Sequence, residues 1–418
     1  MSDQRLSRFS MGIGDRFAHQ TKAQLSAIIE AEKHGIEISP VWNKSHREHT
    51  TIGSKPEDAR RAADQAVKAL RWKKPYFVDA DHVGYETVDL FLDHCDFFTI
   101  DVADFIGRTA ADADIKTFVK THKYLIGDLY FSGLSEPIHI DEELIREIGG
   151  KYLFAVQQAA RIYRKIAAFK KDHNYVIEVS MDETDQPQGP AEILFILSAL
   201  VKEKVPVQTI APKFSGRFNK GVDYQGNLDR FTKEFTSDVA VLQWAAENLD
   251  LPDDLKLSVH SGSDKFSLYP VIRSVIKKFN TGLHLKTAGT TWLEELIGLA
   301  EAGGDGLDLA REVYRQAFEK KEALCKPYAS VINIVESALP SIQEVKAWSS
   351  EDFVNALRHD PENPQYNPNL RQLLHVGYKV AALMGDRYLK ALSDHEEVIA
   401  RNVSDNLLRR HIERLFPV

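Results

Sequence analysis

The chain has few of the features that mark secreted, membrane or metal-finger proteins. Its 418 residues include two cysteines, Cys95 and Cys325, which are too few and too far apart for a CxxC metal site. No apolar run approaches the roughly 20 residues of a membrane span. The N-terminal segment has no apolar stretch of the kind found in signal peptides. We therefore predict a soluble, cytoplasmic protein of a reducing compartment that has no membrane partner.

Signatures of nucleotide and nucleic-acid binding are also missing. No GxGxxG follows a predicted strand, and no GxxxxGK[ST] occurs. The formal net charge is -8, without a basic tract rich in aromatic residues, which argues against a nucleic-acid partner. What remains, 43% hydrophobic and 27% charged residues, is ordinary globular composition with enough length for a large core. The oligomeric state is left open by the sequence.

The stretch from Leu255 to Glu295 contains two strand–turn–helix units. The runs LKLSVH and LHLK alternate apolar and polar residues, which is typical of a strand with one buried apolar face. A Ser/Gly/Thr turn and a helix pattern follow each run, as in the βα unit of a parallel sheet. The polar faces of the two strands carry His260, His284 and Lys286. Barrels place their chemistry on such faces, near the carboxyl ends of the strands.

The same pattern along the chain predicts an α/β fold. From RFSMGIG to LHLKTAG we count about eight strands, most of them separated by helices, which is the number in a TIM-type (β/α)8 barrel. An open doubly wound sheet is the alternative, because strand counting from one sequence can err. We place the barrel at residues 1–303, with an insertion near 105–150. Residues 304–418 are predicted to form a helical C-terminal extension packed on the barrel.

The polar faces of the predicted strands are rich in ionisable groups. A barrel interior that served stability alone would be filled with layers of Val, Ile and Leu. Burying unpaired carboxylate, imidazole or ammonium groups is costly, so these side chains must pair, bind a metal or serve chemistry. The residues on these faces are Asp79, Asp81, Thr99, Asp101, Glu178, Ser180, Asp182, Ser258, His260, His284 and Lys286.

Three histidines are candidates for a metal site. His82, His260 and His284 lie at or near strand ends that a barrel directs into one mouth. Three imidazoles with an open fourth position form a catalytic site of the Zn²⁺ type. A carboxylate from the same faces could replace one imidazole and would admit Mn²⁺ or a similar ion. These carboxylates are Asp79, Asp101 and Glu178.

Lysines that end or follow strands suggest an acidic substrate. Lys213, Lys265 and Lys286 occupy such positions, and Arg217 and Lys220 lie on the loop after APKF. Cations that converge on one mouth suit a sugar acid or a sugar phosphate. Lys286 has an alternative role as a Schiff-base lysine, as in class I aldolases, which would make a metal unnecessary.

At these residues the chain resembles a bacterial family, the tagaturonate epimerases. The stretches that carry the resemblance are MGIGDRF, FVDADHVG, EVSMDET, APKFSGRFNKGVDYQG, SVHSGSDKF and HLKTAGTTWLEE, which run from Met11 to Glu295. The resemblance implies an isomerase that interconverts D-tagaturonate and D-fructuronate in hexuronate catabolism. It also implies a sugar-acid substrate and one divalent cation, such as Zn²⁺ or Mn²⁺.

The implied reaction suggests roles for two carboxylates. Counted as a 2-ketose, the substrate is inverted at C4, which is β to the carbonyl, so a retro-aldol cleavage of C3–C4 is expected. We predict Asp81 as the base and Glu178 as its partner, and Asp182 and Glu183 are rivals for the second role because they lie nearer the strand end. The alternatives are an aldolase or isomerase of a related sugar acid, sugar phosphate or ketose, and a non-catalytic sugar-binding protein.

Overall fold

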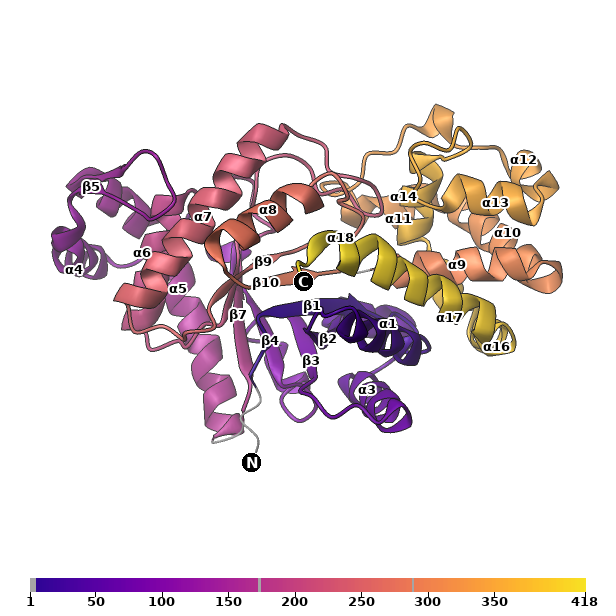
Figure 1. The fold of residues 1–418 in the computed structure, drawn as a ribbon, viewed down its shortest axis with the longest axis horizontal. Helices are drawn as coiled ribbons and strands as arrows, with labels where there is room; N and C mark the ends of the chain where they lie inside the picture. The colour runs from indigo at the N-terminus through magenta and orange to yellow at the C-terminus, as the bar shows by residue number, and fades with distance from the viewer. Residues whose placement is uncertain (1–4, 172–173, 288) are drawn as a thin grey trace.

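Eight parallel strands form a closed barrel in the computed structural model, which describes residues 5–171, 174–287 and 289–418 (Figure 1). Around the barrel the strand order is β1-β10-β9-β8-β7-β4-β3-β2. The predicted TIM-type barrel is therefore confirmed, together with the helical C-terminal region. The barrel strands are β1 (Phe9–Gly14), β2 (Ile38–Ser45), β3 (Phe77–Val83), β4 (Phe97–Asp101), β7 (Val176–Ser180), β8 (Thr209–Ala211), β9 (Lys256–Val259) and β10 (Leu283–Lys286).

Helices follow most of the strands, as the sequence predicts. Local signals explain why they begin where they do: Pro56 and Pro190 occupy first helical turns, where proline has no hydrogen bond to lose. After β3 the chain makes only the single turn η1 (Val88–Leu90) before β4. The outer helices are α1 (Thr21–Lys33), α2 (His46–Ile52), α3 (Pro56–Leu70), α5 (Glu142–Lys170), α6 (Pro190–Lys202), α7 (Leu228–Asn248) and α8 (Tyr269–Phe279).

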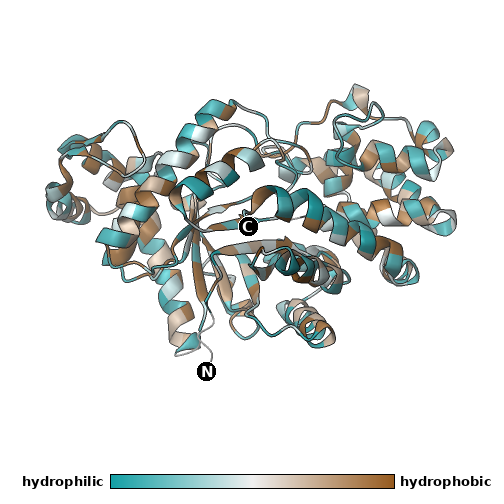
Figure 2. Cartoon of the chain, viewed as in Figure 1, coloured by the Kyte–Doolittle hydropathy of each residue, from teal (hydrophilic) through white to brown (hydrophobic). Residues whose placement is uncertain are grey.

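The barrel interior is apolar at one end and polar at the other. Side chains that point outward from the strands, such as Leu257 and Leu285, join the main core with the surrounding helices. Figure 2 shows the hydrophobic residues gathered between strands and helices, with hydrophilic residues on the outer helix faces. A small apolar cluster fills the interior at the amino ends of the strands: Leu6, Val41, Phe77, Phe97 and Val176. The polar inner residues are stacked above this cluster, toward the carboxyl ends.

The helix after the eighth strand leaves the barrel. This helix, α9 (Thr290–Ala302), packs against α10 (Gly304–Glu319) and α13 (Ser350–Leu357) in a second hydrophobic core. The boundary predicted at residue 303 therefore falls between two helices of that core. The remaining helical segments of the extension are α11 (Lys321–Cys325), η4 (Lys326–Tyr328), η5 (Glu336–Ala338), α12 (Ile342–Ala347), α14 (Pro368–Val376), α15 (Tyr378–Met384) and α16 (Asp386–Asp394).

The chain returns to the barrel at its C-terminal end. The helix α17 (Glu396–Asp405) continues through a π-helical segment, η6 (Asn406–Ile412), into α18 (Glu413–Leu415). These segments pack against α1 and α8, and the yellow ribbon in Figure 1 runs between those two helices. The ring of Phe416 lies 5.1 Å from that of Phe9 in the first strand. In a regular (β/α)8 barrel the helix after the eighth strand fills this position.

The chain between β4 and α5 forms a small lobe inside the predicted insertion. It contains α4 (Asp112–His122), the turn η3 (Lys123–Leu125) and an antiparallel pair, β5 (Gly127–Leu129) with β6 (Ile138–Ile140). Figure 1 shows this lobe on the side of the barrel away from the helical extension. Within the described part of the chain, no helix is long and apolar enough to cross a membrane.

A buried ion pair joins the barrel to the extension. Arg371 of α14 has no exposed surface, and its Nη2 lies 3.0 Å from Oδ1 of Asp264, in the loop after β9. Its Nε donates to the carbonyl of Gly221 at 2.6 Å, and its Nη1 donates to the carbonyl of Leu357 at 2.8 Å. Asp264 has a left-handed backbone with φ of 63°, which is uncommon for a residue other than glycine. Two loops of the barrel mouth are thereby fixed by one side chain of the extension.

Candidate active site

A cavity of about 320 Å³ opens at the carboxyl ends of the barrel strands. Its volume is within the range of small-molecule sites and can hold a six-carbon sugar acid. The barrel contributes Asp81, His82, Asp101, Asp182, Glu183, His260 and Lys286 to its lining, and the extension contributes Tyr328 and His375. Side chains that strand alternation predicts on the inner faces thus meet in one mouth. Two side chains of the C-terminal extension join them there.

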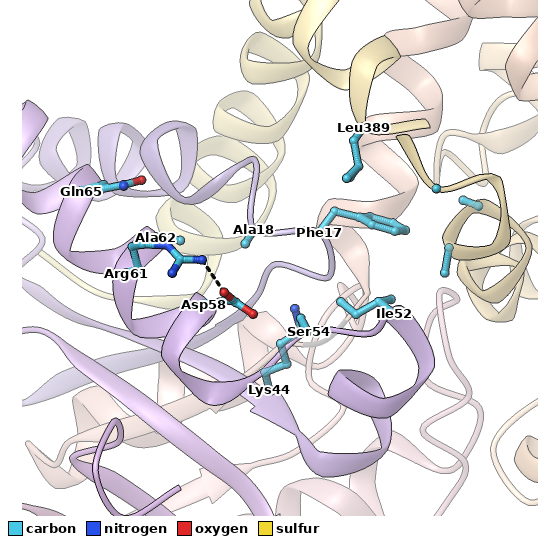
Figure 3. A pocket seen from close by; sticks show the side chains of 13 residues that line it. Phe17, Ala18, Lys44, Ile52, Ser54, Asp58, Arg61, Ala62, Gln65 and Leu389 are labelled. Carbon is cyan, nitrogen blue, oxygen red and sulfur yellow. Dashed lines mark hydrogen bonds and ion pairs between the residues drawn. The ribbon is translucent and has the colours of Figure 1, made fainter. Parts of the chain in front are cut away.

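A second cavity, of about 290 Å³, lies between α3 and α16 (Figure 3). Its charged groups already have partners. Lys44 donates to the carbonyl of Arg16 at 2.6 Å, and Arg61 forms an ion pair with Asp58, drawn as a dashed line in Figure 3. The barrel mouth is therefore the candidate active site.

Two imidazoles and a carboxylate in the mouth are arranged as metal ligands. Among the described residues, His82, Asp182 and His260 each offer a ligand atom, and these atoms all lie within 4.8 Å of one another. The rings of His82 and His260 are 5.2 Å apart. His82 has φ of 51° and lies within a register shift between β3 and β4, so its side chain is directed by an uncommon backbone. This donor set, with open positions, fits a divalent ion such as Zn²⁺ or Mn²⁺.

Carboxylates behind the imidazoles orient the rings. Nε2 of His260 lies 2.7 Å from Oε1 of Glu178, which leaves Nδ1, 3.1 Å from Oδ1 of Asp182, as the ring nitrogen on the side of the cluster. Nδ1 of His82 lies 3.3 Å from Oδ2 of Asp101. Such contacts set the tautomer and orientation of imidazole ligands. Glu178 is fully buried beneath His260 and does not line the cavity.

Lys286 lies at the centre of a ring of acceptors. Its Nζ is 2.8 Å from Oδ2 of Asp79, 2.9 Å from Oδ1 of Asp81 and 3.0 Å from Oε1 of Glu178. It also donates to Oγ1 of Thr99 at 2.5 Å. Burial lowers the pKa of Lys286, but the three carboxylates outweigh it and hold the pKa well above its usual value. Lys286 is thus charged, whereas an imine-forming lysine must be neutral to attack a carbonyl.

The pKa values of Asp79 and Asp81 differ. Burial raises the pKa of Asp79 to about 7, with help from the neighbouring Asp81 and Glu178. Burial opposes ionisation of Asp81 as well, but Lys286 and His82 lower its pKa to about 2. At neutral pH Asp81 is therefore an ionised carboxylate facing the cavity, and Asp79 below it lies close to its titration point.

The pKa values of both imidazoles in this cluster are raised. Burial lowers the pKa of His82, but Asp81 and Asp101 raise it to about 10. In the same way Asp182 and Glu178 outweigh burial and raise the pKa of His260 to about 8. A divalent ion competes for these ring nitrogens, because imidazole must be neutral to bind a metal.

His284 lies below the metal-type cluster and is not part of it. Its Nδ1 is 2.9 Å from Oγ of Ser10, and its ring is stacked on Phe97 at 5.2 Å. Burial lowers its pKa to about 3. His284 precedes Lys286 by two residues, so period two puts both on the inner face, but His284 is roughly 6.5 Å deeper along the strand. The sequence shows the face of a strand residue and not its depth.

The other two predicted substrate lysines lie away from the cavity lining. Nζ of Lys265 donates to three backbone carbonyls, those of Asn219 at 2.9 Å, Val222 at 2.6 Å and Ser263 at 3.0 Å. This lysine therefore fixes the loops of the mouth. Lys213 is held through its backbone N–H, which donates to Oε1 of Gln188 at 2.7 Å.

Three other cations line the cavity. Lys220 is one that the sequence analysis placed on the loop after APKF, whereas Arg16 and Arg47 were not selected. Arg16 lies just after β1 and Arg47 just after β2, so a position directly after a strand end is a signal that could have found both. Tyr328 and His375 of the extension follow no strand and gave no such signal.

Comparison with known proteins assigns the chain to a family. The family model described as tagaturonate epimerase matches residues 2–415. The chain belongs to the tagaturonate epimerase family. It is therefore an isomerase, an epimerase that acts on carbohydrates.

Individual relatives agree with this assignment over almost the whole chain. A tagaturonate/fructuronate epimerase from Thermotoga maritima is 29% identical over 424 residues, covering 98% of this chain and 81% of the relative. The native crystal structure of a fructuronate-tagaturonate epimerase from Cohnella laeviribosi matches with a TM-score of 0.79 and 25% identity, over 97% of this chain and 81% of that one. Its complex with one glycerol gives a TM-score of 0.80, with 98% and 81% coverage.

Proposed function

We propose that the protein is a divalent-metal-dependent epimerase that interconverts D-tagaturonate and D-fructuronate at C4. The observation that carries this proposal is the meeting of His82, Asp182 and His260 with ionised Asp81 in one cavity. The family and the names of its relatives support the choice of substrate.

The position of the inverted carbon favours carbon–carbon cleavage. C4 is β to the C2 ketone, so its hydrogen is not acidified and simple proton abstraction cannot invert it. Its hydroxyl makes C3–C4 a retro-aldol bond: loss of the hydroxyl proton turns C4 into an aldehyde, and the bonding electrons pass to C3 as an enediolate. Rotation of the aldehyde and reversal of the same step give the epimer, so atoms and electrons balance without a redox partner.

The residues of the mouth supply the groups for these steps. A divalent ion held by His82, Asp182 and His260 would supply Lewis acidity toward the oxygens of the substrate. We assign Asp81 as the base that takes the C4 hydroxyl proton, since it is ionised and lines the cavity. Lys286 holds Asp81 in place and stabilises its charge.

The second acid–base group must reach the substrate on its other face. Glu178 is the predicted partner of Asp81, but its oxygens already contact Thr99, Thr209, His260 and Lys286 beneath the cavity. We therefore propose that Glu178 orients His260. Asp182 belongs to the ligand set, and so we propose Glu183 for the second role. Glu183 lines the cavity and is exposed, so it can exchange protons with water.

The test is incubation of the metal-loaded protein with D-tagaturonate, followed by NMR. We expect conversion to D-fructuronate, with retention of the C4 hydrogen when the reaction is run in D₂O. Deuterium at C4 would exclude the cleavage mechanism but not the epimerase function. Absence of D-fructuronate with every divalent ion of the Zn²⁺ or Mn²⁺ type would refute the function itself.

A further inference from the structure

The barrel mouth contains a group of cations beside the metal-type cluster. Arg16, Arg47 and Lys220 all line the cavity. Nζ of Lys220 lies 2.9 Å from Oγ of Ser261, the residue after the proposed ligand His260. Burial lowers the pKa of Lys220, Asp182 and Glu183 raise it, and the guanidinium groups of Arg16 and Arg47 lower it, with a lower pKa as the net result. The three cations are therefore close enough to repel one another.

Among the described residues, one of these three cations has a direct carboxylate partner. Arg16 forms an ion pair with Glu48 and lies over the ring of Tyr378 at 3.9 Å. Arg47 lies over the ring of Tyr328 at 5.4 Å. Within the described ranges of the chain, no carboxylate oxygen lies within 4 Å of the charged nitrogens of Arg47 or Lys220. An anion that entered the cavity would relieve this repulsion.

The backbone that carries Lys220 is held by the extension. Its N–H donates to the carbonyl of Val331 at 2.8 Å, and the next residue, Gly221, accepts from Arg371 at 2.6 Å. Lys220 is thus positioned by main-chain contacts that do not depend on its own side chain. A cation fixed in advance binds an anion without the full cost of ordering a loop.

We propose that Arg47 and Lys220 form the subsite that binds the carboxylate group of the hexuronate substrate. This inference rests on the proposed function and adds the orientation of the substrate: the carboxylate lies at Arg47 and Lys220, and the reacting carbons lie beside His82 and His260. It replaces Lys213 and Lys265 as carboxylate partners, because these two do not line the cavity.

The subsite also explains how cleavage can be followed by recombination. Breaking C3–C4 leaves the carboxylate on the aldehyde fragment, two bonds away from the aldehyde carbon. A carboxylate held by two cations keeps that fragment in the cavity while rotation about C4–C5 presents its other face. Loss of the subsite should therefore increase release of the two three-carbon fragments into solution.

The proposal is tested with Lys220→Met, Arg47→Met and the double variant of the full-length, metal-loaded protein. Arg217→Met is the matched control, since Arg217 is exposed on the loop of Lys220 and does not line the cavity. Calorimetric titration with D-fructuronate, D-fructose and D-fructose 6-phosphate gives the affinities. We expect each variant to weaken D-fructuronate binding about 10- to 100-fold, the usual loss for a hydrogen bond to a charged group. Binding of D-fructose, and all binding by the control, should not change.

Unchanged D-fructuronate affinity in the double variant would overturn the assignment, as would an equal loss for D-fructose. Tighter binding of D-fructose 6-phosphate than of D-fructuronate by the unmodified protein would make this a phosphate subsite and also overturn it. Release of dihydroxyacetone during turnover, measured enzymatically, should rise in the variants. If the unmodified protein fails to epimerise D-tagaturonate while its affinity for the uronate still depends on Lys220, the proposed function fails and the subsite stands.

Discussion

Replacing Asp264 by Asn should destabilise the protein strongly, because it leaves the guanidinium of Arg371 buried without a counter-charge. Both side chains are fully buried, and their ion pair spans 3.0 Å. Breaking a buried pair by removing one partner costs about 3–5 kcal/mol. Arg371→Met should also be destabilising, since it leaves Asp264 as the uncompensated charge and the carbonyls of Gly221 and Leu357 without their donors.

Urea unfolding of the two single variants and of the double variant forms a cycle that isolates the pair. The double variant should lose less free energy of unfolding than the sum of the single losses, because it leaves neither charge uncompensated. Asp394→Asn serves as the control, since it breaks the exposed ion pair with Lys390 on α16 and should have little effect. Additive losses in the cycle would show that Asp264 and Arg371 do not act as a pair.

The same pair predicts a dependence on pH. Burial opposes ionisation of Asp264, but Arg371 and His359 hold its pKa well below the usual value. A carboxyl with a lowered pKa in the folded state contributes stability above its unfolded pKa of about 3.9, and that stability is lost as pH falls below this value. The gap in free energy of unfolding between the unmodified protein and Asp264→Asn should therefore narrow below about pH 4, by at most about 1.4 kcal/mol per pH unit. A gap that stays constant from pH 7 to pH 3 would refute an ionised Asp264.

Three further predictions concern single side chains. His82→Ala and His260→Ala should lose bound metal in elemental analysis, whereas His284→Ala should retain it because His284 lies outside the cluster. Metal loss in His284→Ala alone would show that His284, and not His82 or His260, is the ligand. Asp81→Asn should keep its metal and lose epimerisation by about 10²- to 10⁴-fold in the NMR assay, and near-normal turnover would remove Asp81 from the mechanism. Asp238 is buried with no hydrogen-bond partner for either oxygen within the described chain, and burial raises its pKa well above the usual value. A carboxyl whose pKa is raised in the folded state makes the fold less stable as pH rises above about 4. In thermal unfolding, Asp238→Asn should therefore stabilise the protein, relative to the unmodified chain, more at pH 7 than at pH 4. An equal effect at both pH values would contradict this.

Most of the barrel follows from local patterns in the sequence. Strand alternation selects the inner face correctly for Asp81, Glu178, His260 and Lys286, because period two is a property of any strand. It does not give depth, which is why His284 was grouped with ligands that lie above it. The helix at residues 46–52 also has a local signal, because Ser45 accepts from the N–H of Glu48 at 3.3 Å as its N-cap.

The parts of the site that depend on long-range packing could not be predicted. Lys265 resembles any lysine after a strand, and only the folded loops bring three carbonyls to its ammonium group. Tyr328 and His375 reach the cavity because helices far along the chain fold back over the mouth. The assignment of bound metal, the cytoplasmic location and the domain boundary stay predictions.

The position of α17 and α18 against α1 and α8 has a consequence for biosynthesis. The strands are complete once Lys286 has been made, yet 93 residues lie between the end of α9 at Ala302 and the start of α17 at Glu396. At the usual speed of translation those residues take about 5 to 20 s to synthesise. During that time the nascent barrel has a gap between its first and last outer helices, with the apolar side chains there open to water. We expect this interval to be when chaperones engage the chain, and purified chains that end before Glu396 to be more sensitive to protease than chains that include α18.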